Sequence, residues 1–295
     1  MPRHEILVDL VLTEEQHLEI DSYELTRILG TLEDEYERFS SSLERRTRVP
    51  DGAEVFGRIR RVITAGHSVE TVVGEILTLR NSIRDELEDV PVFSASLDLR
   101  RRTIMRLFDM LDSRIRQVRA PSRTTTTWID QDLFAFEHLF ELYFEVMSST
   151  GDSPYRVRFT DSSDRDDTYR ILLSLTAQND ETMRVPARLC DIMIDLAENA
   201  LKFSEPGSRV DISIAEKPDH LELSVRDKGI GIPEKEITRV VGYGARGSNA
   251  GDVPSGGGLG LTKAYSLIRG WGGRMWIESS PAGTTIEAEV PKPAP

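Results

Sequence analysis

The feature that most constrains the fold is a helix with a polar stripe, followed by two glycine-rich turns among short strands. Apolar spacing predicts the helix from about Pro186 to Phe203, and a second helix from Leu259 to Arg269 follows the second turn. Runs with the alternation typical of strands surround both helices; they are 155–159, 168–175, 182–185, 210–215, 220–226, 274–278 and 284–290. Strands interleaved with helices predict an α/β fold for the C-terminal part of the chain.

The first of these helices carries Asp195, Asn199 and Lys202 on one face, because spacings of four and three residues bring side chains to the same side. Lys202 is also the first lysine of the chain. The amide oxygen of Asn199 can ligate Mg²⁺, Lys202 can neutralise phosphate oxygens, and Asp195 can orient or deprotonate a nucleophile. The alternative is a solvated face with ordinary charges. Glu198 is interpreted as an exposed helix residue.

The first glycine-rich turn, "DKGIGIP", places Asp227 at the end of an expected strand, with Gly229 and Gly231 on either side of Ile230. Glycine has no Cβ, so the backbone can approach a flat ligand closely. A carboxylate at a strand end can accept a hydrogen bond from an exocyclic amine such as that of adenine. The same letters also suit an ordinary turn between a strand and a helix, and the dinucleotide fingerprint does not fit because no helix opens at the required distance.

The second turn, "SGGGLGL", contains Gly256, Gly257, Gly258 and Gly260 and opens the second helix. Freely turning backbone amides at a helix N-terminus form an anion site suited to phosphates. The alternative is a flexible loop before a helix. The turn is not a P-loop, because the Gly-Lys-Ser/Thr ending is missing.

In this order, "ENALKFS", "DKGIGIP", "GGGLGL" and "AGTTIEAEVP" resemble the asparagine box, the two glycine boxes and the closing strand of the GHKL superfamily. The superfamily groups type II topoisomerases, heat-shock chaperones, sensor histidine kinases and mismatch-repair ATPases, and the wording here is closest to the histidine kinase catalytic domain. The resemblance covers about Trp128 to Pro291. It implies a two-layer α/β sandwich of the Bergerat type that binds ATP and Mg²⁺.

The resemblance also implies a role for each matching residue: Mg²⁺ at Asn199, adenine at Asp227 with support from Thr284, and phosphates near Lys202 and the second glycine box. The implied nucleotide-binding set is Asn199, Lys202, Asp227, Gly229, Gly231, Arg246, Gly256, Gly258, Leu259, Gly260, Leu261 and Thr284. A mobile lid is implied from Val240 to Ser255. Arg246 would reach the γ-phosphate from it, although the phenylalanine-rich lid segment of histidine kinases is absent here.

One residue departs from the histidine kinase pattern. Many of these kinases carry an asparagine four residues before the metal-binding asparagine, and this chain has Asp195. Hydrolytic members of the superfamily and its serine kinases carry an acid there. A carboxylate at this position can activate water or a hydroxyl, so Asp195 is expected to be the catalytic residue.

Residues 1–120 resemble no family and are expected to form a sensor, dimerisation or partner region, separate from an ATP-binding domain at 121–295. Helical spacing predicts helices over about 22–43 and after Pro91. Residues 54–87 are ambiguous. Their repeat of about 3.5 residues fits a paired helix, but the β-branched run from Val62 to Val73 fits a hairpin equally well. The region is therefore expected to be mainly helical or α+β.

His67 is the best candidate for a phosphoacceptor histidine, because "HSVET" loosely resembles the acceptor motif of histidine kinases. The motif normally has an acid after the histidine and a proline at the position of Val72, and this chain has Ser68 and Val72 instead. If "AGHS" is a hairpin turn, His67 is merely a turn residue. His138 is interpreted as a core or rim histidine.

The composition excludes several classes of partner. The net charge is −13 and both parts of the chain are acidic, which argues against nucleic acid. The single cysteine, Cys190, fits a reducing cytosol. No apolar run approaches the roughly 18 residues of a membrane helix, and the first ten residues are too acidic for a signal peptide. A cytoplasmic protein without a membrane partner is expected.

These observations predict an ATP–Mg²⁺-binding, histidine-kinase-like protein that hydrolyses ATP or transfers its γ-phosphate in bacterial signalling. A protein partner or phosphoacceptor protein is expected, and a homodimer through residues 1–120 is an open possibility. One alternative is a non-catalytic, nucleotide-dependent switch that controls a partner protein. The other is a GHKL ATPase without phosphotransfer.

Overall fold

The computed structural model describes residues 2–43, 54, 56–57, 61, 69–88, 90, 94–119, 127–149, 156–159, 168–179, 181–251 and 258–293. The chain divides into two compact units. The α/β unit consists of Met1–Thr13, Pro121–Ser148 and Ser153–Pro295. The helical unit consists of Glu14–Ala120 with Ser149–Asp152.

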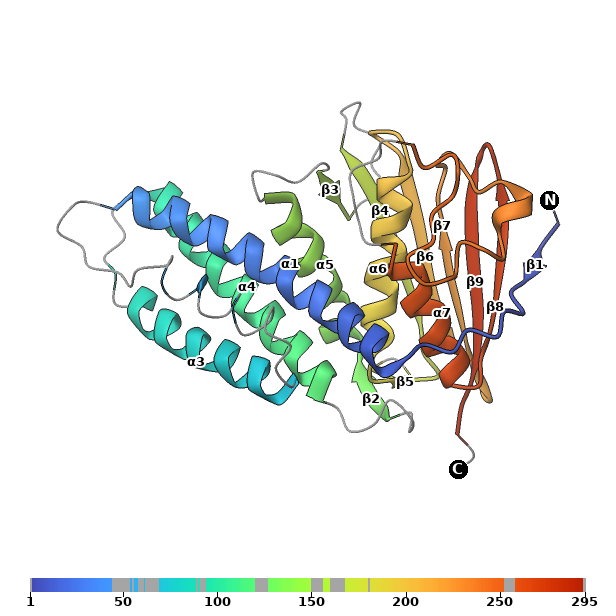
Figure 1. Ribbon diagram of the computed structural model, residues 1–295, viewed down its shortest axis with the longest axis horizontal. Helices are drawn as coiled ribbons and strands as arrows, with labels where there is room; N and C mark the ends of the chain where they lie inside the picture. Colours follow the sequence, from blue (N-terminus) through green and yellow to red (C-terminus); the bar gives the residue numbers. More distant parts are fainter. Residues whose placement is uncertain are drawn as a thin grey trace. The chain divides into compact units, whose positions relative to one another are not determined.

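The α/β unit is built on a seven-stranded sheet with the order β1-β8-β9-β7-β6-β4-β3 (Figure 1). Its strands are β1 (His4–Glu5), β3 (Val157–Arg158), β4 (Tyr169–Thr176), β6 (Arg209–Glu216), β7 (His220–Arg226), β8 (Arg274–Ser280) and β9 (Gly283–Pro291). The pairs β3–β4 and β4–β6 are parallel, and the other neighbours are antiparallel. The sheet is therefore mixed. Alternating side chains of β6, such as Val210, Ile212 and Ile214, are buried, which is the period-two pattern that marked this strand in the sequence.

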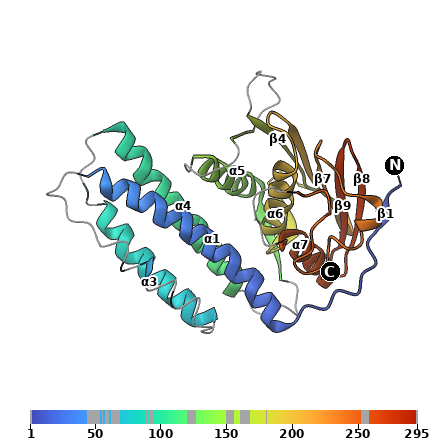
Figure 2. The ribbon, with the colours of Figure 1, turned by 45° about the horizontal axis from the view of Figure 1, so that its top comes forward.

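Three helices of the described residues form the second layer of this unit. They are α5 (Leu133–Ser149), α6 (Leu189–Lys202) and α7 (Gly260–Gly270), and both ribbon views show them on the same face of the sheet (Figures 1 and 2). Helix α6 packs on β6, β7 and α7, and α7 packs on β8. A separate two-stranded sheet joins β2 (Trp128–Asp132) to β5 (Thr182–Pro186). The expected two-layer α/β architecture is confirmed.

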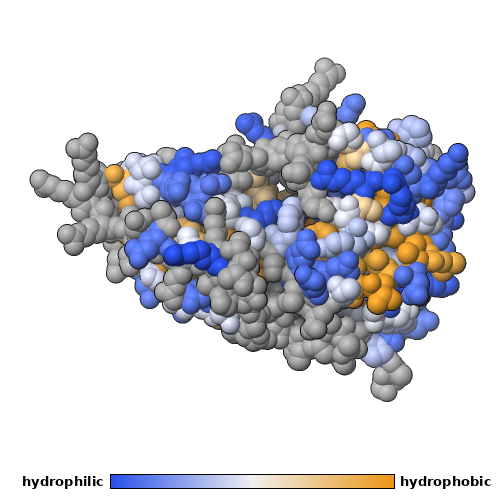
Figure 3. Space-filling model, viewed as in Figure 1, coloured by the Kyte–Doolittle hydropathy of each residue, from blue (hydrophilic) through white to orange (hydrophobic). Residues whose placement is uncertain are grey.

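The first residues of the chain belong to the α/β unit, although the sequence assigned residues 1–120 to a separate region. Strand β1 pairs with β8, and the Ile6 N–H donates to the carbonyl of Met275 at 2.9 Å. The guanidinium of Arg3 lies 4.3 Å from the ring centre of Trp276. On the outer side, Leu7 and Val11 are 74% and 80% exposed, and the view in Figure 3 shows an apolar area on the side of the α/β unit where this segment runs.

The helical unit contains α1 (Glu14–Ser41), α3 (Val69–Glu88) and α4 (Ala95–Arg119). Helix α4 packs against both α1 and α3. Glu35 on α1 is 3% exposed and pairs with Arg38 at 2.8 Å and with Arg100 of α4 at 3.2 Å. The fully buried apolar side chains of this unit include Leu32, Phe39, Ile76, Ile83, Ile104, Leu107, Phe108 and Leu111.

The helical unit decides one of the open alternatives. Val69–Glu88 is a helix, so the paired-helix interpretation holds for this stretch and the hairpin interpretation does not. The "AGHS" sequence lies outside the described residues, and so does His67.

Candidate functional site

Helix α6 presents its acidic stripe to the protein interior. Its apolar residues recur around most of its circumference, and Asp191 and Asp195 are 1% and 7% exposed. A carboxylate buried to this degree needs a counter-charge or several hydrogen bonds. Asp195 therefore does not lie on a solvated face, so the alternative of an ordinary exposed charge is wrong for this residue.

The counter-charge is a lysine that the sequence analysis did not identify. Lys263 on α7 is 3% exposed, and its Nζ lies 2.8 Å from Asp195 Oδ2 and 3.1 Å from Asp191 Oδ2. Arg188, just before α6, reaches the same Asp191 oxygen at 3.1 Å through Nη2. The sequence signal for this pair was a single lysine, Lys263, in a mostly apolar helix, together with Asp191 and Asp195 one helical turn apart.

The start of α7 packs directly on the asparagine box. A Cβ at Gly260 would lie 3.3 Å from Asn199 Nδ2 and 3.4 Å from the Cβ of Asp195, so a side chain here would push these neighbours by a few tenths of an ångström. Leu259 precedes the helix and is buried, and Leu261 is half-buried. The asparagine box and the end of the second glycine box are thus neighbours. Gly256 lies outside the described residues.

The C-terminal end of α6, one turn beyond Asn199, touches the first glycine box. The carbonyl of Phe203, the residue that ends the helix, accepts a hydrogen bond from the Ile230 N–H at 3.0 Å. A Cβ at Gly229 would collide with that carbonyl, and a Cβ at Gly231, whose φ is +71°, would collide with the carbonyl of Ser280. Here the glycines let backbone pack on backbone, a cause that differs from the ligand approach inferred from the sequence.

Asp227 is fixed by the same turn. Its Oδ1 accepts hydrogen bonds from the N–H groups of Gly229 at 2.7 Å and Thr284 at 3.0 Å. Burial raises the pKa of the Asp227 carboxyl above its usual value, and these two N–H groups oppose that rise. No hydrogen bond or ion pair within the described part of the chain involves Oδ2, so this oxygen can accept a bond from a ligand.

Thr284 joins the turn through its side chain as well. Its hydroxyl lies 2.8 Å from the hydroxyl of Ser279, which in turn accepts a hydrogen bond from the Ile232 N–H at 2.8 Å. Strands β8 and β9 therefore hold the first glycine box through two hydroxyl groups. The sequence pointed to Thr284 and missed Ser279.

The segment expected to be a lid is described up to Gly251. It follows a short 3₁₀ helix, Glu234–Glu236, and Glu236 accepts a hydrogen bond from the Ser248 N–H at 2.7 Å. Asn249 Nδ2 donates to the carbonyl of Gly231 at 2.8 Å. Val240 and Val241 are buried, whereas Arg246 is exposed. The structure thus anchors the segment at both of its described ends and leaves Arg246 on the outside.

Two further residues of α6 differ in their surroundings. Lys202 is half-buried, and its ammonium lies 5.5 Å from the ring centre of Phe203. Glu198 is not simply an exposed helix residue, because its Oε1 accepts a hydrogen bond from the hydroxyl of Tyr143 on α5 at 2.6 Å. Tyr143 is buried, so this hydrogen bond ties α5 to α6.

The donor set fits ATP with Mg²⁺. An uncommitted carboxylate oxygen at Asp227, the amide of Asn199 and the bare Cα of Gly260 are the features that adenine, a hard cation and phosphates require. Among the described residues, no group of three or more His, Cys, Asp or Glu side chains is arranged to hold a metal. Such a cation would therefore depend on Asn199, phosphates and water.

The described helices include none that is long and apolar enough to cross a membrane.

Comparison with known proteins places the site in a family. The sequence model described as histidine kinase-, DNA gyrase B-, and HSP90-like ATPase matches residues 184–294. The adaptive-response sensory kinase SasA of Prochlorococcus marinus is 35% identical over 107 residues, which cover 36% of this chain and 28% of that protein. The sensor histidine kinase WalK of Bacillus subtilis is 36% identical over 108 residues, which cover 35% of this chain and 18% of that protein.

Among solved structures, the mycobacterial sensor histidine kinase MprB shares 21% identity with a TM-score of 0.41, over 57% of this chain and 97% of that chain. The chain spans little more than a quarter of SasA and under a fifth of WalK. Residues 184–294 of the chain are a domain of the histidine kinase-, DNA gyrase B- and HSP90-like ATPase family, to which a sensory kinase and a sensor histidine kinase are similar over this part.

Proposed function

We propose that the α/β unit binds ATP with Mg²⁺ and either hydrolyses it or transfers its γ-phosphate to a protein in bacterial signalling. The observation that supports this most directly is that α6 contacts both glycine boxes. Asn199 lies beside Gly260 in the last turn of the helix, and the carbonyl of Phe203, which caps that turn, accepts from the Ile230 N–H. The C-terminal turn of α6 therefore sets the distance between an adenine site and a phosphate site.

Each residue has a role in this proposal. Asp227 accepts the exocyclic amine of adenine through Oδ2, because its other oxygen is already held by two backbone N–H groups. Asn199 offers its amide oxygen to Mg²⁺, and Lys202 neutralises phosphate charge. When bound, Mg²⁺ supplies charge stabilisation for phosphoryl transfer, while the protein supplies position.

Titration calorimetry tests the binding step. ATP with Mg²⁺ is expected to saturate the full chain, and ATP without Mg²⁺ to bind more weakly. Asn199→Ala should remove the Mg²⁺ dependence, because no other side-chain amide in the described part of α6 can replace it. Absence of saturation by folded wild-type protein would end the proposal.

Incubation with γ-labelled ATP decides where the phosphate goes. Label on the protein that is lost in His67→Ala supports a phosphoacceptor histidine. His138→Ala is the matched control, since His138 is an exposed residue of α5 that stacks on Phe134. Free phosphate without labelled protein supports an ATPase. Label that persists in His67→Ala rejects this histidine as the acceptor.

A nucleotide-dependent switch without catalysis is the second candidate, and one observation favours it. The carboxylate expected to be the base, Asp195, is already engaged by Lys263 at 2.8 Å. Saturable ATP binding with neither labelled protein nor free phosphate would support the switch. The physiological partner, a homodimer through residues 1–120 and a cytoplasmic location are further proposals that binding partners, sedimentation and cell fractionation would test.

A further inference from the structure

A chain of four charged groups lies beneath the site at the interface of α6 and α7. Arg188 contacts Asp191 at 3.1 Å, Asp191 contacts Lys263 at 3.1 Å, and Lys263 contacts Asp195 at 2.8 Å. The last three side chains are between 1% and 7% exposed. Two positive and two negative charges alternate, so the cluster is balanced as a whole.

Burial makes this balance sensitive to the loss of any one member. Removing one partner of a buried ion pair leaves an uncompensated charge, which costs far more than the intact pair contributes. Asp191 would retain Arg188 if Lys263 lost its charge. Asp195 would lose the ammonium that lies 2.8 Å from its Oδ2.

The location of Lys263 gives the cluster a function. Lys263 lies three residues, or about one turn, after Gly260, which packs on Asn199 and on the Cβ of Asp195. The ammonium therefore fastens the phosphate-proximal end of α7 to the face of α6 that carries Asp195 and Asn199. A buried ion pair at 2.8 Å holds one carboxylate oxygen in place and thereby restricts the orientation of the other.

We propose that Lys263 is a positioning residue: it orients the Asp195 carboxylate toward the attacking oxygen and holds the second glycine box at a fixed distance from Asn199. Asp191 and Arg188 keep the ammonium in place from the other side. This inference rests on the proposed function, because it assigns Lys263 a part in the same reaction. Lys263 itself does not touch the nucleotide.

A double-mutant cycle in the full chain tests this role. Lys263→Met removes the charge and keeps most of the length, and Asp195→Asn removes the carboxylate. We expect Lys263→Met to lower kcat for phosphate release or transfer at least 30-fold and to change KM for ATP less than threefold. If Lys263 acts through Asp195, the double variant will be no slower than Asp195→Asn alone.

Lys292→Met is the matched control. Lys292 pairs with the buried carboxylate of Glu216 at 2.6 Å, and it lies outside the nucleotide site. Its effect on kcat should be small and should multiply with that of Asp195→Asn. Asp191→Asn combined with Lys263→Met removes one charge of each sign and serves if Lys263→Met alone does not fold. Partial recovery of kcat in Lys263→Arg would support a charged positioning group.

The results separate the two claims. No ATP binding by folded wild-type protein refutes the proposed function. ATP turnover with multiplicative effects of Lys263→Met and Asp195→Asn, or with kcat of Lys263→Met within threefold of wild type, refutes the role of Lys263 alone. If wild-type protein binds ATP without turnover, the same cycle is applied to the Kd for ATP–Mg²⁺, where coupling supports the role and multiplicative effects overturn it.

Discussion

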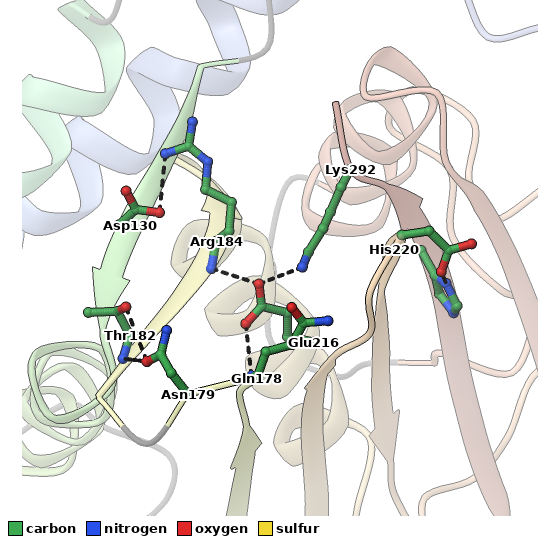
Figure 4. A network of polar contacts seen from close by, with 9 residues as sticks. Asp130, Gln178, Asn179, Thr182, Arg184, Glu216, His220 and Lys292 are labelled. Carbon is green, nitrogen blue, oxygen red and sulfur yellow. Dashed lines mark hydrogen bonds and ion pairs between the residues drawn. The ribbon is translucent and has the colours of Figure 1, made fainter. Parts of the chain in front are cut away.

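The two ends of the main sheet each bury a carboxylate that is held by two backbone N–H groups, and only one of them has a counter-ion. At the nucleotide end, Asp227 follows β7 and accepts from Gly229 and Thr284 through one oxygen. At the opposite end, Glu216 closes β6 and accepts from the N–H groups of Gln178 at 3.1 Å and Arg184 at 3.2 Å (Figure 4). Lys292 adds an ammonium at 2.6 Å from Glu216.

The pKa values of the two acids move in opposite directions. Burial raises the pKa of Glu216, but the Lys292 ammonium and the two N–H groups outweigh it and lower the value overall. Burial also raises the pKa of Asp227, and there the N–H groups alone do not reverse it. A complete set of partners marks a structural carboxylate. A carboxylate left one partner short, at a cost in stability, is suited to a ligand.

The largest expected effect contrasts glycines at the two ends. Gly231 and Gly272 have φ of +71° and +77°, but a Cβ at Gly231 would collide with the Ser280 carbonyl, whereas one at Gly272 would lie 3.5 Å from the ring of Pro291. Gly231→Ala should therefore cost more than about 3 kcal/mol of unfolding free energy, and Gly272→Ala about 1 kcal/mol. Urea denaturation measures both, and equal costs would contradict the crowding at the nucleotide end.

Exchanging each acid for its amide should separate stability from binding. Glu216→Gln leaves Lys292 beside a neutral group and should cost about 3 kcal/mol of stability, with unchanged ATP affinity. Asp227→Asn places a donor where adenine also donates and should weaken ATP binding by about 2 kcal/mol, or roughly 30-fold. Its stability should stay within about 1 kcal/mol of wild type. Calorimetry and denaturation of both variants provide the test, and a loss of affinity in Glu216→Gln would break the comparison.

The pH dependence should have opposite signs at the two ends. Glu216 has a lowered pKa, so its stabilisation is present above the unfolded value of about 4.3 and is lost as pH falls through the folded value. Asp227 has a raised pKa, so the folded state gains stability as pH falls through that value. Denaturation measured from pH 7 to 3.5 should show that the difference in unfolding free energy between wild type and Glu216→Gln becomes smaller. Over the same pH range, the free energy of unfolding of wild type should rise relative to that of Asp227→Asn.

The smallest effect concerns one asparagine at each end. Asn179 accepts from the N–H groups of Glu181 at 3.1 Å and Thr182 at 2.7 Å, which fixes the turn before β5. Asn249 instead ties the lid segment to the Gly231 carbonyl at 2.8 Å. Asn179→Ala should cost about 1 kcal/mol of stability, whereas Asn249→Ala should change ATP affinity about threefold with little effect on stability. Melting curves and calorimetry compare them, and a purely structural role for Asn249 would reverse the pattern.

Residues whose meaning lies in local spacing could be found from the sequence. Asn199, Asp227 and Gly260 each sit in a short pattern, and the order of the patterns identified the domain before any coordinates were known. Residues whose partners come from distant segments could not. Glu216 looks like any acid at a strand end until β4, β5 and the residues after β9 bring three donors to it. Lys263 became meaningful only when α7 packed on α6.

Two interpretations changed for physical reasons. The glycines of the first box were expected to admit a ligand, and they primarily admit the carbonyls of Phe203 and Ser280. Glu198 was expected to face solvent, and the hydroxyl of Tyr143 holds it. Both changes reflect tertiary contacts that a one-dimensional pattern does not contain. His67 and Gly256 remain predictions, because they lie outside the described residues.

Tyr265 has a consequence for how the nucleotide-binding half of the molecule can be isolated. Its hydroxyl is fully buried, accepts a hydrogen bond from the Val8 N–H at 3.0 Å and lies within bonding distance of the Ile6 and Val8 carbonyls. A fragment that begins at residue 121 would leave that hydroxyl without its partners at Ile6 and Val8. It would also expose the edge of β8 that pairs with β1 and remove the buried Ile6 side chain. In the order of the chain, the helical unit, with α1, α3 and α4 among its described residues, interrupts a domain that has already begun. An isolated form of that domain therefore needs both pieces.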